Sequence, residues 1–476
     1  MRFLVAFYLV CLICWIVARI LRLAMRRQVE LLSIHTVFLG GFTIFQLTSS
    51  ILGLAFSMYG DLEPADKVGT PVIFAFVATI FLILFEWSYK REWALLRRAR
   101  TPGKGDWDGG AGGWIFLSIV LLAIGGFLKF VLMWIPLIGI LASQAAAGVL
   151  AAAAASAAWA WSRNFRNPML MAIAGIILLA AIAFVSYQSF GRRGVVGIPL
   201  AFAWGLYYGY WRGLPMGLLI RRVTIAAVAG LVLLSVYTAT RREGGNYERQ
   251  TLVDRLAAIS QMRAEDFSAA LTAVLSGQNS GPLSMWALET YGSAYPYNFL
   301  HQIKFFVAMP VPRNIWANKP YPLAKDMVHH GSIRNKGSGD VFNVGPGIIG
   351  HIAHDFPFIA LPVYAIGIGL IVRFLDERVR WALHRPFVMI PIGCALGQTI
   401  AFSRGEAGLF MWNGMMALLG AWFAMRLSGR FAMMFGAMGQ TDPTEPWDPL
   451  YWDPAWDEQP TSNDPAEDGV LAGPQT

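Results

Sequence analysis

Side chains able to carry out acid–base chemistry are concentrated in one stretch of the chain, from Arg313 to Asp355. Its titratable residues are Arg313, Lys319, Lys325, Asp326, His329, His330, Arg334, Lys336, Asp340, His351, His354 and Asp355. Arginine and lysine beside glycine-rich backbone supply the donors that bind a diphosphate group. Histidine and aspartate can accept a proton from a hydroxyl group. The stretch therefore predicts a site for a phosphate-bearing substrate.

Within this stretch, four residues are candidates for the group that accepts the proton. A carboxylate or a neutral imidazole near the diphosphate would activate a hydroxyl nucleophile. The candidates are His330, His351, His354 and Asp340. His351 and His354 are preferred because they precede an apolar span, where a helix would hold them rigidly beside the arginines of the loop. The alternative is that both histidines only cap and pack the start of that helix.

The same histidines do not form a typical zinc motif. His351 and His354 are three residues apart, with Asp355 beside them, and could share one helical face. The chain has no HExxH pattern, however, and the side chains of the adjacent His329 and His330 point apart on regular backbone. We expect neither a metal ion nor any other cofactor.

Composition indicates the class of protein that must hold these residues. Hydrophobic residues make up 56% of the 476-residue chain and charged residues only 14%, with a mean hydropathy of +0.50. A soluble chain carries roughly 25% charged residues and needs a mostly polar surface. The three cysteines lie in apolar stretches, which excludes a disulfide framework. We therefore expect an all-α, polytopic helical bundle in a membrane.

Apolar runs locate the spans of this bundle. About 20 apolar residues are needed to cross a bilayer, and eleven runs meet that requirement. They cover residues 3–21, 31–57, 69–89, 114–136, 137–161, 168–188, 195–211, 223–240, 356–375, 386–402 and 408–426. The alanine-rich run at 137–161 has the small side chains that allow close packing between helices inside a bundle.

The basic residues orient the bundle. Apart from one long loop, 21 of them lie on one side of the predicted spans and six on the other. Basic residues in short loops favour the cytoplasmic side. We therefore expect a multi-pass protein of the cytoplasmic (inner) membrane, with its N-terminus outside and its C-terminus in the cytoplasm.

This orientation divides the chain into four parts. Residues 1–240 hold the first eight spans, and residues 241–342 form a large extracytoplasmic loop. Residues 343–430 hold the last three spans, and residues 431–476 form an acidic tail that we expect to be disordered in the cytoplasm. The first part of the loop predicts short amphipathic helices on the membrane surface, and the second part predicts a proline-rich, structured loop.

Two motifs, one in the loop and one at the start of the span that follows it, carry a resemblance to a known family. MPVPRNIWANKP at 309–320, followed by the glycine-rich GPGIIGHIAHDFP at 345–357, resembles the oligosaccharide repeat-unit polymerases, the Wzy-type O-antigen polymerases of bacterial envelopes. ETYG at 289–292 and SRGE at 403–406 also look like family features. One departure is that an acidic residue expected in the glycine-rich motif is replaced around His351.

The resemblance implies an activity and its partners. Such enzymes are metal-independent membrane glycosyltransferases that transfer a growing glycan from undecaprenyl diphosphate to the next lipid-linked repeat unit of a surface polysaccharide. Partners would be the polyprenyl-diphosphate-linked oligosaccharide, membrane lipid and other envelope assembly proteins, with no nucleic acid. Glu289, in ETYG, joins the candidates for the base. The candidates for substrate binding are Arg313, Lys319, Arg334, Arg404, His330, Trp316 and Tyr291.

Two other classes of function stay open. A transporter or flippase of lipid-linked sugars would place charged residues inside the membrane on broken, repeated helices; Glu86 and Lys129 are among the few candidates for such charges. Another envelope glycosyltransferase or ligase is the second alternative. A mannosyltransferase-type enzyme would carry paired acids after its first span, whereas Asp61, Glu63 and Asp66 follow the second.

The predicted orientation can be tested by labelling. Cysteine introduced at Ser276 or Ser338, both in the large loop, should react with a membrane-impermeant thiol reagent in intact cells or spheroplasts. Labelling that occurs only after lysis would overturn the orientation.

Overall fold

The computed structural model is almost entirely helical. It describes residues 1–26, 29–59, 62–100, 107–135, 138–187, 192–242, 257, 259–275, 279–311, 313, 315–330, 345–383 and 385–440. Two short strands in these ranges, β1 (Trp107–Asp108) and β2 (Gly439–Gln440), pair in an antiparallel register.

Nine helical segments in the described ranges are long and apolar enough to cross a membrane. They are α1 (Arg2–Met25), the run of α2 (Ile34–Phe42), η1 (Thr43–Thr48) and α3 (Ser49–Phe56), α4 (Gly69–Lys90), α6 (Gly110–Phe130), α7 (Gly139–Arg163), α8 (Pro168–Ser186), α10 (Met216–Arg242), α17 (Pro357–Arg380) and α20 (Ala407–Met434). The predicted class, an all-α protein with multiple apolar helices, is confirmed. The count of crossings stays a prediction.

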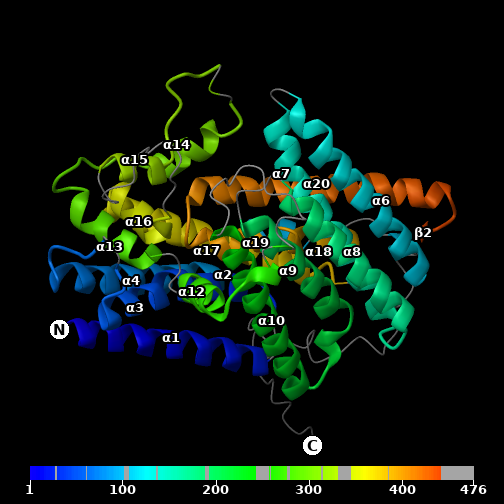
Figure 1. The fold of residues 1–476 in the computed structure, drawn as a ribbon, viewed down its shortest axis with the longest axis horizontal. Helices are drawn as coiled ribbons and strands as arrows, with labels where there is room; N and C mark the ends of the chain where they lie inside the picture. Colours follow the sequence, from blue (N-terminus) through cyan, green and yellow to red (C-terminus); the bar gives the residue numbers. More distant parts are fainter. Residues whose placement is uncertain are drawn as a thin grey trace, which may run out of the picture. The chain divides into compact units, whose positions relative to one another are not determined.

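The two remaining predicted spans correspond to shorter apolar helices. One is α9 (Arg192–Gly209), and the other is broken into α18 (Pro386–Gly393) and α19 (Leu396–Phe402). The remaining helices of the described ranges are short: α5 (Leu96–Ala99), η2 (Leu132–Trp134), η3 (Trp211–Gly213), α12 (Ala264–Leu275), α13 (Ser280–Thr290), α14 (His301–Ala308), α15 (Leu323–His329) and α16 (Gly347–His354). Figure 1 shows α13, α14, α15 and α16 gathered near one end of α4 and α17.

Helix α7 is packed on several sides because its residues are small. It contacts α6, α8, α9 and α20. In its most apolar part 72% of the residues are buried, the largest share among the described spans. A Cβ atom on Gly148 would lie only 2.1 Å from the carbonyl oxygen of Ala417 in α20. The close packing predicted for the alanine-rich run is therefore confirmed.

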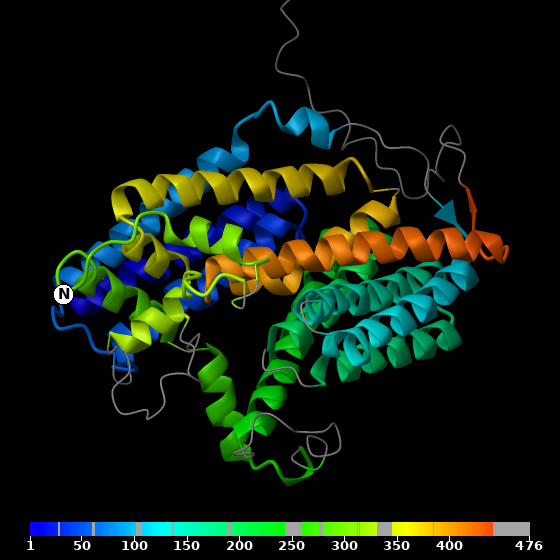
Figure 2. The same cartoon turned by 90° about the horizontal axis from the view of Figure 1, so that it is seen from above.

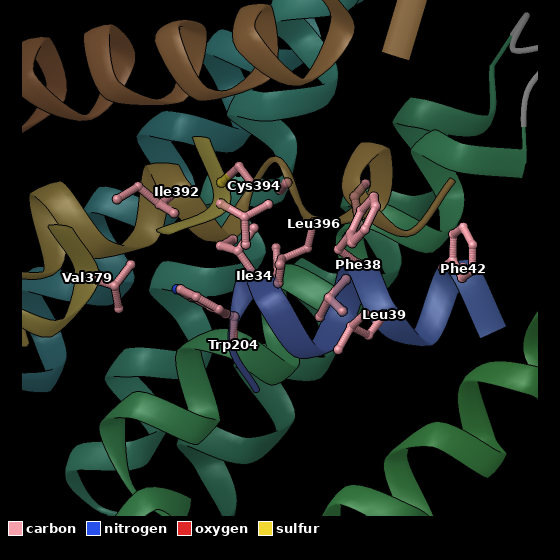
Figure 3. Packing of buried hydrophobic residues seen from close by; sticks show 14 of the residues in the cluster. Ile34, Phe38, Leu39, Phe42, Trp204, Val379, Ile392, Cys394 and Leu396 are labelled. Carbon is pink, nitrogen blue, oxygen red and sulfur yellow. The ribbon is translucent and has the colours of Figure 1, made fainter. Parts of the chain in front are cut away.

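Helix α2 lies in a second packed region, against α19 and α17. Its Phe38 and Phe42 pack against phenylalanines of α4, and the Phe42 and Phe81 rings are stacked with centroids 5.3 Å apart. Trp204 of α9 donates from Nε1 to the carbonyl oxygen of Met389 in α18, at 3.1 Å. Figure 3 shows Phe38 and Phe42 on α2, with Trp204 nearby.

A π-helical segment, η1, places one amide where three other segments meet. π turns are rare and widen a helix locally. In this segment Gln46 is fully buried; its Nε2 donates to the carbonyl oxygen of Ser403 at 2.7 Å, and its Oε1 accepts from Ser284 at 2.9 Å. A Cβ atom on Gly347, whose φ is +67°, would lie 2.0 Å from this amide nitrogen. Gln46 thereby joins α13, the start of α16 and the turn after α19.

The close contact between α7 and α20 predicts that a glycine-to-alanine substitution lowers thermal stability at Gly148 but not at Gly230. Alanine in a helix is favoured over glycine by about 0.5–1 kcal/mol. Gly230→Ala in α10, where nothing lies within 4 Å of the new Cβ, should keep or raise the thermal midpoint in detergent. Gly148→Ala should lower it, because overpacking costs about 1–3 kcal/mol. A Gly148→Ala protein that is as stable as the wild type would contradict this packing.

Candidate functional site

The centre of the candidate site is Asp355, which follows α16 and has no exposed surface. Its Oδ2 accepts the backbone N–H of Gln302 at 2.8 Å and the hydroxyl of Tyr364. Its Oδ1 accepts Nδ1–H of His354, 2.5 Å away. A buried carboxylate is stable only when donors satisfy it. Asp355 therefore links α14, α16 and α17 at one point.

This contact orients the His354 ring, which is itself 2% exposed. Because Nδ1 faces Asp355, Nε2 is left facing Asp326 of α15, with 3.8 Å between Nε2 and Oδ2. The edge of the ring meets Tyr291, with centroids 4.7 Å apart and planes nearly perpendicular. His354 is thus held between two carboxylates.

Asp326 is the most exposed of the three residues Asp355, His354 and Asp326. The Tyr291 hydroxyl donates to its Oδ2 at 3.1 Å, and His330 Nδ1 lies 3.5 Å from the same oxygen. Burial, and then the charge of Asp326, raise the pKa of Tyr291, so the phenol stays a donor. The side chain of Asp326 is 41% exposed, against 3% for His354 and 0% for Asp355. A buried carboxylate is thereby connected through an imidazole to a carboxylate that solvent reaches.

His330 and His301 complete the ring of imidazoles around His354. The His330 ring stacks on Tyr295, with centroids 3.7 Å apart and planes 15° apart. The His301 ring lies 5.1 Å from that of His354, and its Nε2 bonds the carbonyl oxygen of Tyr321 at 2.8 Å. His330, a predicted substrate-binding residue, and His354, a predicted base, both contact Tyr291 and Asp326.

His351, the other preferred base, is fully buried between α16 and the start of α20. Its Nε2 accepts the backbone N–H of Ala407 at 3.1 Å and lies 3.1 Å from the carbonyl oxygen of Gly405. Burial lowers the pKa of His351, which keeps the ring neutral. Its Nδ1 has no hydrogen-bond partner among the described residues. His351 therefore packs one helix against another, the alternative that its sequence context left open.

Glu406, at the start of α20, anchors the helix that carries Asp326. Its carboxylate accepts the backbone N–H groups of Leu323 and Ala324, at 3.0 and 3.1 Å, and the Gln302 side-chain amide at 2.8 Å. A carboxylate at a helix N-terminus satisfies unpaired N–H groups and matches the helix dipole. Asp326 follows Ala324 by two residues, so Glu406 sets its position.

Two non-glycine residues with positive φ flank the site: Leu300, at 48°, and Phe356, at 73°. The segments that contain them are joined by the backbone N–H of Asn298, which donates to the carbonyl oxygen of His354 at 2.9 Å. Such conformations cost about 1–3 kcal/mol and occur where the surroundings enforce them, often at functional sites.

Two of the predicted substrate-binding residues, Arg313 and Lys319, fold their own loop. Arg313 donates to the carbonyl oxygens of Lys319 and Pro320, at 3.0 and 3.1 Å, and lies over the Tyr321 ring. Lys319 Nζ donates to the carbonyl oxygens of Met309 and Val311, both at 3.0 Å. Burial, and then the charge of Arg313, lower the pKa of Lys319. The motif at 309–320 therefore forms a closed turn.

The other candidates lie in different places. Arg404 sits on the turn before α20, where a Cβ atom on Gly345 would be 2.6 Å from its carbonyl oxygen, so it borders the start of α16. Trp316 is 43% exposed. Glu289 accepts the backbone N–H groups of Ala65 and Asp66, at 3.1 and 2.7 Å, and so ties α13 to the loop before α4. Arg334 and Asp340 lie outside the described residues.

Several residues that build this site carry no clear signal of that role in the sequence. Asp326 was within the titratable stretch, but its charged neighbours gave no reason to choose it. Tyr364 lies inside an apolar span, and Glu406 was noted only as part of SRGE. One usable signal was the presence of acids immediately before apolar helices, as in Asp355 before α17 and Glu406 before α20. Among the described residues, no group of three or more His, Cys, Asp or Glu side chains is placed to hold a metal ion.

A second polar cluster lies near the opposite ends of α4 and α17. His35 Nε2 is 2.8 Å from Glu86 Oε1, and Arg19 of α1 pairs with the other oxygen of Glu86. Asp376 accepts the backbone N–H groups of Ile34 and His35. Since α17 begins at Pro357, Asp376 is about 28 Å along its axis from the candidate site. The structure thus gathers buried charges that looked isolated in the sequence.

The fold and the site define a multi-pass, all-helical membrane protein with an acid–base cluster near one end of its apolar helices. The chain matches no protein-family profile, no curated protein and no solved structure. The support for a function therefore comes from side-chain geometry and from the short motifs around residues 309–320 and 345–357.

The burial of His351 predicts a pH dependence of stability. The unfolded chain protonates this residue below a pKa near 6.5, whereas the folded protein keeps it neutral to lower pH. The unfolded state then binds more protons, so stability is complete above about pH 6.5 and falls as the pH falls. Thermal unfolding in detergent at pH 7.5 and 5.5 should show a smaller decline for His351→Gln than for the wild type. His329→Gln, at an exposed position, is the matched control; equal declines in all three proteins would contradict the assignment.

Proposed function

We propose that the protein is a metal-independent membrane glycosyltransferase that joins lipid-linked oligosaccharide repeat units into a surface polysaccharide. The observation that carries the proposal is His354, held by the buried Asp355 and facing the partly exposed Asp326. This is the arrangement that a general base for a hydroxyl nucleophile needs. The polymerase-like motif at 345–357 contains His354 and Asp355, and the motif at 309–320 precedes the helix that carries Asp326.

In this proposal Asp326 is the base, and His354 and Asp355 are positioning residues. The acceptor hydroxyl oxygen attacks the anomeric carbon of the donor sugar, and its proton passes to the Asp326 carboxylate. The bond between that carbon and the diphosphate oxygen breaks, and polyprenyl diphosphate leaves with the electron pair. The proton then passes to solvent, which reaches Asp326. The role of base moves from His351, which is buried and bonded to Ala407, to Asp326.

The leaving diphosphate gains negative charge, which cations near the site would stabilise. Arg404 borders the start of α16, and Arg334 belongs to the same titratable stretch; we assign both to the diphosphate. Arg313 and Lys319 hold the turn that carries Trp316. The stacked Tyr295–His330 pair supplies a flat surface on which a sugar can rest.

The proposed location is the cytoplasmic membrane, with the site on the outer side. The excess of basic residues in the loops on the other side supports this orientation. The second polar cluster, at the end of α4 that carries Glu86, would then face the cytoplasm.

A transporter of lipid-linked sugars is the second candidate, and one observation favours it. His35, Glu86 and Arg19 form a buried charged cluster within apolar helices, and ionisable residues in such positions often mark transport pathways. The two functions differ in what accumulates. Loss of a polymerase leaves single repeat units at the cell surface, whereas loss of a transporter removes them from the surface.

The proposal predicts the effect of neutralising Asp326. In cells that lack the wild-type gene, Asp326→Asn should convert long glycan ladders into single repeat units, and the rate of transfer with purified protein should fall by about 10²–10⁴-fold, the usual contribution of a general base. His354→Gln should lower the rate in the same direction.

Glu265→Gln is the control, because it removes a carboxylate from an exposed position on α12. It should leave both ladder length and rate unchanged. Wild-type ladders from Asp326→Asn and His354→Gln would refute the assigned base, and absence of repeat units from the surface would favour the transporter.

A further inference from the structure

Helix α14 and the segments on either side of it expose an unusual amount of apolar side chain beside the candidate site. We call this surface the α14 patch. Its members are Phe299, Ile303, Val307, Ile315 and Trp316, with exposed fractions of 49, 42, 67, 72 and 43%. Ile303 and Val307 are one helical turn apart and so share one face of α14. The opposite face is buried and carries His301, Gln302 and Phe305.

Contacts of the buried face fix the position of α14 along the length of the apolar helices. The Gln302 side chain accepts the backbone N–H of Gly408 in the first turn of α20, at 2.9 Å. The Gln302 backbone donates to Asp355, two residues before α17 begins. Figures 1 and 2 show α14 beside the beginning of α20. The α14 patch therefore lies at the level where two membrane-crossing helices start.

A row of aromatic rings connects this region to the apolar surface of a span. Tyr297 meets the edge of Phe356 at 5.4 Å, and Phe356 meets Phe358 at 5.7 Å. Phe358 is in the first turn of α17 and is 80% exposed, as expected for a side chain that faces lipid. Aromatic residues concentrate at the boundary between the hydrocarbon and the headgroups of a bilayer.

Basic residues border the α14 patch. Lys304 is exposed on α14 itself. Arg313 and Lys325 lie over the ring of Tyr321, at 4.1 and 4.7 Å from its centroid. An apolar face bordered by lysine and arginine is typical of segments that lie in the membrane interface, where the charged groups meet anionic headgroups.

We propose that the α14 patch inserts into the bilayer interface and that membrane lipid is its occupant. The continuity with the lipid-facing Phe358 and the cationic border favour lipid over a second copy of the chain. His301, on the buried face of α14, lies against His354, so insertion holds the acid–base cluster at the depth of the lipid headgroups. If the proposed function holds, this depth selects a substrate whose phosphate sits at the membrane surface, namely a lipid-linked sugar.

Spin labels measure this insertion directly. The full-length protein carries Cys11→Ser and Cys14→Ser, while the buried Cys394 is left in place. A cysteine at Val307 is labelled with a nitroxide in vesicles of phosphatidylcholine and phosphatidylglycerol. Collision with oxygen reports the hydrocarbon, and collision with a water-soluble nickel chelate reports the aqueous phase. Matched labels at Phe358 and at the exposed Ser293 define the lipid and water limits.

The oxygen-to-nickel ratio at Val307 should be severalfold higher than at Ser293 and close to that at Phe358. A ratio equal to that at Ser293 would place the α14 patch in water, and an immobile label that neither reagent reaches would indicate a protein contact; either result overturns the proposal. A label at Ile303 gives an independent reading if the Val307 variant does not fold. The measurement does not depend on catalysis. If the α14 patch inserts but the wild type transfers no glycan, the proposed function is rejected and the proposal that the α14 patch inserts into the bilayer stands.

Discussion

The arrangement of α14, α16 and the start of α17 depends on the buried carboxylate of Asp355. Removing a carboxylate from water costs several kcal/mol unless nearby donors replace the lost hydration. Here the donors come from three separate elements: the Gln302 backbone of α14, the His354 ring of α16 and the Tyr364 hydroxyl of α17. Movement of any one of these helices would leave the charge partly unsatisfied. The carboxylate therefore fixes the directions of the side chains around it, above all that of His354.

The same requirement explains why the helices near the site are short or interrupted. Several of the polar groups buried near the site come from places where the backbone turns or widens. Gln46 projects from a π turn, Glu406 precedes α20, and Gly347 begins α16 with a φ of +67°. In each case backbone irregularity and a buried polar contact occur together, because each one stabilises the other.

Polar chemistry is divided between two regions of the bundle. One contains Asp326, His354 and Asp355, with an outer carboxylate that solvent reaches. The other contains His35 and Glu86, which are hydrogen-bonded to each other and almost fully buried. The apolar α14 patch lies beside the first region only. In the proposed function, the reactive carboxylate has to be open to solvent and close to the lipid headgroups, and this asymmetry would meet both needs.

The sequence by itself determined the class of protein, because hydropathy and helix length depend on local composition. It also located the titratable stretch and predicted the close packing of the alanine-rich α7. Small side chains allow close packing whichever helix is the neighbour, so this prediction did not need the tertiary structure. Only the tertiary structure decided which polar groups meet. Gln302 bonds Glu406 across 104 residues, and Gln46 bonds Ser403 across 357. Such pairs, like the contacts of His351 with Ala407 and of Glu289 with Asp66, arise from helix positions that no local pattern encodes.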